Sequence, residues 1–280
     1  MTRRTFELRG TSFGREGELF LIAGPDLLEP EELCLRVAAR VSGFARRLGI
    51  PYIFKGSFDK ANRTSAEGYR GPGIERGLKT LRRVREEVGV PVVTDVHEPW
   101  QAKVAAEVAD VLQVPAFLCR QTDLVQACAA TGRVVHLKKG QFLSPWEMRR
   151  VVEKVEAAAP GGPEAARAIL TERGTMFGYN MLVNDLRSIP IMQETGYPVC
   201  FDATHSQQVP AAYGSSSGGM RSMIAPIARA AVAAGADGVF FEVHEEPAAA
   251  RVDADTHLAL SELERLLEGL LAIKNSSRRV

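Results

Sequence analysis

Ionisable or amide side chains follow each of a series of short apolar runs in this sequence. They are Asp26, Lys55 with Lys60, Asp95 with His97, Gln113, Lys138, Arg173, Asp202 with His205, and Glu242 with His244. Any one of them alone is more simply explained as a structural ion pair or a solvated loop charge. Because polar groups follow every run, a shared polar site is the better explanation of the whole set.

Cations are concentrated at these positions or in the segments just after them. They are Lys55, Lys60, Arg63, Arg120, Lys138 and Arg173. Lys138 ends the apolar run 134–137, where a solvated lysine would be out of place. Arginine binds carboxylates and phosphates in a bidentate manner, and lysine binds them as a point charge. The cluster therefore predicts a site for small phosphorylated substrates.

A second group combines one imidazole with three carboxylates. Its members are Asp26, His205, Glu242 and Asp253. Such a set can bind a divalent cation, and three carboxylates favour a hard ion such as Mn²⁺, Mg²⁺ or Fe²⁺. A hydrogen-bonded polar cluster without metal explains the same residues equally well, so both interpretations stay open.

The apolar runs alternate with amphipathic stretches, which predicts how these residues are positioned. The runs expected to be strands are 19–23, 52–55, 92–96, 111–114, 134–138, 168–171, 199–203 and 238–243, and helices are expected at 31–48, 145–158, 220–234 and 257–273. This pattern predicts an α/β protein, a closed (β/α)8 TIM barrel that forms one domain over residues 1–280, with its active site at the C-terminal ends of the strands. Within residues 1–18, a short β-hairpin is expected to cap one end. An open doubly wound sheet is the alternative, but no G-x-G-x-x-G motif follows a strand.

The bulk composition is that of an ordinary globular enzyme. Apolar residues make up 45% of the 280 residues, charged residues 25%, and the net charge is +1, which gives no broad field for nucleic acid or an anionic membrane. The basic N-terminus lacks the apolar core of a secretory signal, and the longest apolar runs are too short to span a bilayer. The four cysteines show no metal-ligand spacing. We expect a cytoplasmic protein with no nucleic-acid or membrane partner.

Several longer motifs are specific enough to indicate a family. They are 22–25 (IAGP), 54–65 (FKGSFDKANRTS), 69–73 (YRGPG), 94–98 (TDVHE), 113–118 (QVPAFL), 120–123 (RQTD), 138–142 (KKGQF), 171–174 (TERG) and 201–206 (FDATHS). In these motifs the chain resembles the 3-deoxy-D-manno-octulosonate 8-phosphate synthases, also called 2-dehydro-3-deoxyphosphooctonate aldolases. The resemblance covers nearly the whole chain in order.

The resemblance implies a transferase that forms a carbon–carbon bond. It would condense phosphoenolpyruvate with D-arabinose 5-phosphate and water, releasing inorganic phosphate, for lipopolysaccharide biosynthesis. Lys60, Lys138, Arg173, Gln113 and the Ala116 backbone would hold phosphoenolpyruvate, with Lys55 nearby. The catalytic residues would be Lys60, Lys138, His205, Asp95 and Glu242.

The second substrate and the assembly state also follow from the resemblance. The segment Asn62, Arg63, Thr64 and Ser65 would bind the sugar phosphate. Arg120 of a neighbouring subunit would complete that pocket, which implies a homo-oligomer, typically a tetramer.

Two positions depart from the family pattern. Thr64 replaces the usual serine and keeps the hydroxyl. Position 26 is cysteine in metal-dependent members and asparagine in metal-independent ones, whereas this chain has Asp26. A divalent metal (Mn, Mg, Fe or Zn) and a metal-free site therefore both stay open.

Three other functions compete with this one. The related heptulosonate 7-phosphate synthases use erythrose 4-phosphate, but their Lys-Pro-Arg-Thr-Ser signature differs from residues 60–65 here. A Schiff-base aldolase would use a strand-end lysine such as Lys138 as its nucleophile. The third is a non-catalytic barrel that binds sugar phosphates and has lost its activity through the change to Asp26.

Overall fold

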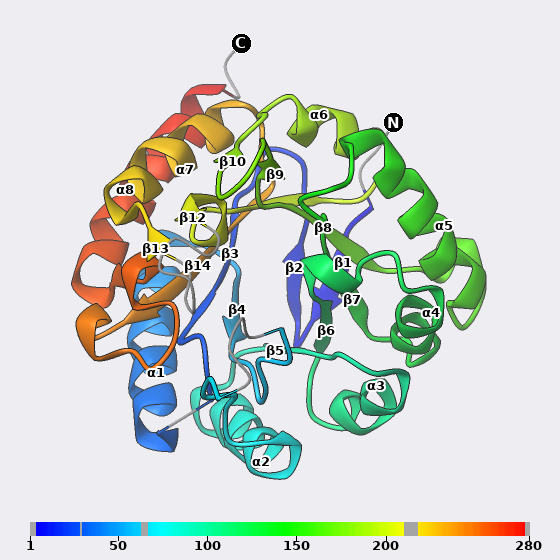
Figure 1. The fold of residues 1–280 in the computed structure, drawn as a ribbon, viewed down its shortest axis with the longest axis horizontal. Coiled ribbons are helices and arrows are strands. Elements are labelled where there is room, and N and C mark those ends of the chain that lie inside the picture. Colours follow the sequence, from blue (N-terminus) through cyan, green and yellow to red (C-terminus); the bar gives the residue numbers. More distant parts are fainter. Residues whose placement is uncertain (1–3, 29, 63–66, 210–217, 278–280) are drawn as a thin grey trace.

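The computed structural model describes residues 4–28, 30–62, 67–209 and 218–277. They form a closed parallel barrel surrounded by a ring of helices (Figure 1). The barrel strands are β3 (Phe20–Gly24), β4 (Tyr52–Lys55), β5 (Val92–Asp95), β6 (Val111–Val114), β7 (Val134–Lys138), β8 (Ala168–Glu172), β11 (Val199–Asp202) and β14 (Gly238–His244). Each pairs with the next, and β14 pairs with both β11 and β3. This closure confirms the predicted (β/α)8 barrel and rules out the open sheet.

Helices cover the outside of the barrel between successive strands. They are α1 (Glu31–Leu48), α2 (Ile74–Arg83), α3 (Pro99–Ala106), α4 (Thr122–Ala130), α5 (Met148–Ala158), α6 (Ser188–Gln193), α7 (Ile224–Ala233) and α8 (Leu260–Ser277). The outward side chains of the strands pack against the apolar faces of these helices in one large core. No described helix is long and apolar enough to cross a membrane.

Alternate strand residues point into the barrel, because successive side chains of a strand face opposite ways. The part of the interior nearer the N-terminal ends of the strands is apolar. It includes Phe20, Ile22, Ile53, Val93, Val111, Val134, Ile169, Cys200 and Phe240. On five of these strands, the residue two positions later also points inward, and it is polar. These residues are Lys55, Asp95, Gln113, Asp202 and Glu242. The interior thus changes from apolar to ionisable toward the C-terminal ends of the strands.

The predicted N-terminal hairpin closes the opposite end of the barrel. Its strands β1 (Phe6–Leu8) and β2 (Thr11–Phe13) pair antiparallel, and their side chains join the apolar cluster of the barrel interior. The Phe13 ring stacks on Phe6 and lies edge-on to Phe20, at the start of β3, with centroids 5.6 Å and 6.1 Å apart. This plug shields the interior from water at the end away from the polar residues.

Some element boundaries differ from the sequence prediction. The helix expected at 257–273 starts at Leu260, because Leu258 and Ala259 form β15 and pair with the end of β14. The helix expected from residue 145 begins with a 3-10 turn, Pro145–Glu147, in which Ser144 and Glu147 form a capping box. The expected strand 19–23 lies one residue later, at Phe20–Gly24. Boundaries shift this way because end residues follow tertiary contacts rather than the apolar pattern alone.

Candidate active site

The inward polar residues meet at the C-terminal mouth of the barrel, as the sequence predicted. Gly24 occupies the inward position at the end of β3, where a Cβ would collide with the Lys55 backbone carbonyl. The missing side chain lets β3 and β4 approach closely at this point. Lys55, Asp95, Lys138 and Glu242 are almost completely buried there, so their charges depend on one another rather than on water.

Two lysines share a group of carboxylates on one side of the mouth. Lys60, from the segment after β4, forms an ion pair with Asp26 and lies 3.8 Å from Asp95 and 3.9 Å from Glu242. Lys55 Nζ lies 3.8 Å from both Asp26 and Asp95 and 3.5 Å from Glu242. The lysine charges therefore hold this cluster of carboxylates together.

These charges shift the pKa values of the carboxyl groups in different directions. Burial raises the pKa of Asp26, but Lys60 and then Lys55 outweigh it and hold that pKa well below its ordinary value. Burial likewise opposes ionisation of Asp95, yet Lys55 and Lys60 lower its pKa to about 2. Burial and the neighbouring Asp26 charge raise the pKa of Glu242 to about 7. The two lysines thus stabilise the ionised form of Asp26 strongly and that of Glu242 much less.

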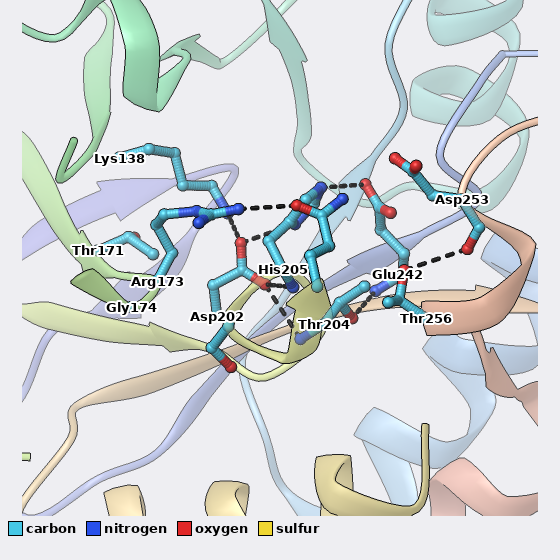
Figure 2. Close-up of polar contacts among 12 residues, drawn as sticks. Lys138, Thr171, Arg173, Gly174, Asp202, Thr204, His205, Glu242, Asp253 and Thr256 are labelled. Atoms are coloured by element: carbon cyan, nitrogen blue, oxygen red, sulfur yellow. Dashed lines mark hydrogen bonds and ion pairs between the residues drawn. The ribbon is translucent and has the colours of Figure 1, made fainter. Parts of the chain in front are cut away.

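Lys138, Asp202 and His205 form a second chain of contacts (Figure 2). Lys138 Nζ donates to Asp202 Oδ2 at 2.6 Å, and His205 Nδ1 lies 2.8 Å from the same oxygen. Because the carboxylate accepts, Nδ1 carries a proton. Burial opposes protonation of the ring, but Asp202 and then Glu242 outweigh it and raise the pKa of His205 above its ordinary value. Nε2 lies 3.4 Å from Glu242 Oε1. Asp202 therefore directs His205 toward Glu242.

Three predicted metal ligands lie together next to this chain. One ligand atom each of His205, Glu242 and Asp253 falls within a group whose members are all within 4.8 Å of one another. Asp253 adopts a left-handed backbone conformation, φ 48°, which is uncommon for a residue with a side chain. Its carbonyl accepts from Thr256 Oγ1 at 3.1 Å and lies 2.9 Å from His257 Nδ1. The turn at 253–256 thus fixes the backbone of Asp253 next to His205 and Glu242, while Asp26 lies outside the group.

Two of the expected phosphoenolpyruvate ligands have unused hydrogen-bonding capacity. Arg173 is buried, and its Nη2 donates to Gln208 at 2.8 Å. Gln113 Nε2 donates to Asp95 at 2.6 Å. Among the described residues, Arg173 Nη1 and Gln113 Oε1 have no hydrogen-bond partner. Buried polar atoms are rarely left unpaired, so both are available for a ligand.

A buried ion pair next to Arg173 in the sequence fixes the backbone at this residue. Lys139 Nζ lies 3.6 Å from Glu172 Oε2, and both side chains are almost completely buried. Glu172 Oε1 accepts from the backbone N–H of Arg173 at 3.0 Å and of Gly174 at 2.6 Å. These contacts fix the direction in which the chain leaves β8.

The residues expected to bind the sugar phosphate are less completely placed. Asn62 is exposed at the rim, while Arg63, Thr64 and Ser65 lie outside the described residues. Ala116, half-buried, begins the 3-10 turn after β6, and Arg120 lies exposed just beyond that turn. Neither is part of the buried network of the mouth.

Two residues of the mouth make contacts that their places in the sequence do not predict. Asp202 was included only as a strand-end group, yet it links Lys138 to His205. Phe240 was treated only as part of an apolar run, yet its ring lies directly beneath Lys138, 3.3 Å from the centroid to Nζ. The inward parity of β14, counted back two residues from Glu242, would have indicated Phe240.

The sequence of this chain is similar to those of known proteins along nearly its whole length. Residues 5–276 match the model of the DAHP synthetase I family. The 2-dehydro-3-deoxyphosphooctonate aldolase of Cyanothece sp. is 55% identical over 262 residues, 93% of this chain and 94% of that protein. The protein of the same name from Pelobacter propionicus is 53% identical over 270 residues, 96% of this chain and 97% of that protein. The one from Bordetella petrii is 50% identical over 271 residues, 96% and 95% of the two chains.

Proposed function

This chain belongs to the DAHP synthetase I family, and we propose that it is a 2-dehydro-3-deoxyphosphooctonate aldolase. It condenses phosphoenolpyruvate with D-arabinose 5-phosphate and water in lipopolysaccharide biosynthesis. The relatives named above support this choice within the family. The structural observation that carries it is the buried set of cations at the barrel mouth, with an unused Arg173 Nη1 facing no protein partner among the described residues.

The mouth supplies what such a condensation needs. Lys138, Arg173, Lys60 and Gln113 hold the phosphate and carboxylate of phosphoenolpyruvate. Its C3 bonds to the aldehyde carbon of the sugar, and a water oxygen bonds to C2 as phosphate leaves. The two water protons end on the new hydroxyl and on the phosphate. Negative charge develops on the aldehyde oxygen and on the oxygen of the departing phosphate. Fixed cations in a buried site stabilise this charge without reorganisation during the reaction.

Glu242 is the group placed to accept a proton from water, and His205 lies beside it. His205 Nε2 and Glu242 Oε1 face each other at 3.4 Å, and Asp202 orients the His205 ring from the other side. A base must lie within hydrogen-bond reach of the proton that it removes. We therefore assign acceptance of the proton from water to Glu242, with His205 as its neighbour, and assign Asp95 the role of orienting Gln113 through their 2.6 Å hydrogen bond.

We also propose that His205, Glu242 and Asp253 hold a divalent metal. Three observations support this: the grouping of their ligand atoms within 4.8 Å, a buried Glu242 Oε2 without a hydrogen-bond partner among the described residues, and His205 oriented by a carboxylate. Their donor set favours Mn²⁺, Mg²⁺ or Fe²⁺. The ion would act as a Lewis acid on a substrate oxygen. Asp26 instead serves as the counter-charge of Lys60.

Phosphate release from phosphoenolpyruvate tests the proposed function. We expect release with arabinose 5-phosphate and at least about a hundredfold lower kcat/KM with erythrose 4-phosphate, because a site built for the longer sugar leaves polar groups unpaired around the shorter one. Mass spectrometry should identify the eight-carbon product. Faster turnover of erythrose 4-phosphate would indicate a heptulosonate 7-phosphate synthase. Borohydride inactivation that needs substrate would indicate a Schiff base. Tight binding of both substrates without turnover would indicate a binding protein.

We further propose that the protein is a cytoplasmic homotetramer. Its four cysteines are buried free thiols, which fits a reducing compartment. Exposed apolar side chains gather on the segments that follow β6, β7 and β8. They are Phe117, Phe142, Trp146, Met176, Phe177, Met181 and Val183. Phe142, Met176, Phe177 and Val183 line one groove of about 380 Å³. An apolar surface of this kind is typical of an interface. If Phe117 packs in that interface, Arg120, three residues later, lies next to the neighbouring subunit.

Sedimentation equilibrium tests this assembly. We expect a mass about four times that of the 30.5 kDa chain, with the apolar groove of each chain covered by a neighbouring copy in the proposed tetramer. The Phe177→Asp variant should sediment as dimers or monomers and should have a raised KM for the sugar phosphate. Trp100→Asp, on α3, is the matched control and should remain tetrameric. A monomeric parent protein would contradict the proposal.

A further inference from the structure

The Phe240 ring forms the floor of the barrel mouth beneath its cations. The ring is completely buried on β14 and points into the barrel. Lys138 Nζ lies 3.3 Å from the ring centroid, and Lys55 Nζ lies 5.7 Å from it. The face of an aromatic ring carries negative electrostatic potential, which attracts an ammonium group most strongly where water is excluded.

Among the described residues Lys138 has one carboxylate partner, Asp202, and that partner is shared. Asp202 Oδ2 binds both Lys138 and the ring of His205, while Asp202 Oδ1 accepts the backbone N–H groups of Thr204 and His205. Lys138 itself is only 4% exposed. An ammonium group buried to this extent is costly unless further interactions stabilise it.

We propose that Phe240 is a positioning residue that holds the Lys138 ammonium group by a cation–π interaction and presents it to the anionic substrate. A second carboxylate in this place would bind Lys138 more strongly, but it would neutralise the charge that must bind phosphoenolpyruvate. The ring adds no net charge, so Lys138 is stabilised and keeps its positive charge for the substrate. The identity of the substrate rests on the proposed function, whereas the contact between ring and ammonium does not.

Fluorinated phenylalanines at position 240 test the proposal in the full-length protein. One, two or three fluorine atoms withdraw electron density stepwise from the ring face and nearly preserve the ring shape. We expect the dissociation constant of phosphoenolpyruvate, measured by calorimetry, to rise with each fluorine. The rise should reach about thirtyfold for the trifluorinated ring, which is about 2 kcal/mol at 1.4 kcal/mol per tenfold. The KM for phosphoenolpyruvate should rise correspondingly, with a smaller change in kcat.

Phe241 provides the matched control, because it is equally buried but belongs to the core between strands and helices. The same fluorinated series at position 241 should leave phosphoenolpyruvate binding unchanged, and it corrects for the effect of fluorine on packing. Binding that is insensitive to fluorination at position 240, or that tightens with it, would overturn the proposal.

Urea unfolding separates this inference from the proposed function, since it needs no substrate. After correction with the Phe241 series, stability should fall with each fluorine at position 240 in the parent protein. In the Lys138→Met background that dependence should disappear. If it persists without Lys138, the cation–π assignment is wrong whatever the enzyme's substrate. If it disappears but phosphoenolpyruvate is not bound, the contact is upheld and the proposed function fails.

Discussion

Replacing Lys60 with methionine is expected to destabilise the protein by about 3 kcal/mol and to lower kcat/KM by about a thousandfold. Lys60 forms an ion pair with Asp26 and lies within 4 Å of both Asp95 and Glu242. Its removal leaves buried carboxylates with Lys55 as their remaining close ammonium partner in the described structure. The same change removes a cation from the proposed phosphoenolpyruvate site, so stability and activity should fall together.

The double variant Lys60→Met with Asp26→Asn separates the two effects. Removing the Asp26 charge should restore most of the lost stability, because the unpaired carboxylate is the main source of the cost. Activity should not return, since the substrate still lacks its cation. Urea unfolding and phosphate-release kinetics supply the two measurements, and Lys103→Met, an exposed lysine on α3, is the control. A double variant no more stable than the single one would refute the Lys60–Asp26 pairing as described.

Chelation of the purified enzyme is expected to lower its activity at least about a hundredfold, and Mn²⁺ should restore it. His205→Gln should abolish high-affinity Mn²⁺ binding, because it replaces the imidazole of the three-residue group. Asp202→Asn should weaken binding about 10–100-fold, since a carboxylate that orients a metal-binding histidine typically contributes that much. Electron paramagnetic resonance of free Mn²⁺ measures these affinities independently of turnover.

Asp26→Asn distinguishes the proposed ligand set from the four-residue set suggested by the sequence. Because Asp26 lies outside the group and pairs with Lys60, this variant should retain Mn²⁺ binding within about threefold of the parent. Asp255→Asn, an exposed carboxylate two residues from Asp253, is the control. If Asp26→Asn loses binding as His205→Gln does, Asp26 is a ligand after all. Full activity of the chelator-stripped enzyme would instead show that no metal is needed.

Local sequence pattern was enough to predict the barrel. The eight strand segments were predicted to within one or two residues at each end, and helix 31–48 was predicted at its observed bounds. This succeeds because strands buried on both faces form nearly continuous apolar runs, which turns and amphipathic helices interrupt regularly. The same pattern predicted which polar residues stand at the strand ends, and therefore most members of the site.

The pairing of those residues could not be predicted from the sequence. An apolar run buried on both faces does not itself show which residues point inward. Parity with Glu242 distinguishes Phe240 from Phe241, but it does not show that the Phe240 ring lies against Lys138. Asp26 belonged by residue type with the possible metal ligands, but the path of the chain after β4 brings Lys60 to it. Asp253 reaches His205 and Glu242 through a left-handed turn held by Thr256 and His257. Residue types and strand order thus determined that a cationic site exists, whereas closure of the barrel decided which charges neutralise each other. Those pairings join residues far apart in the chain, and their energies depend on burial that exists only in the folded protein.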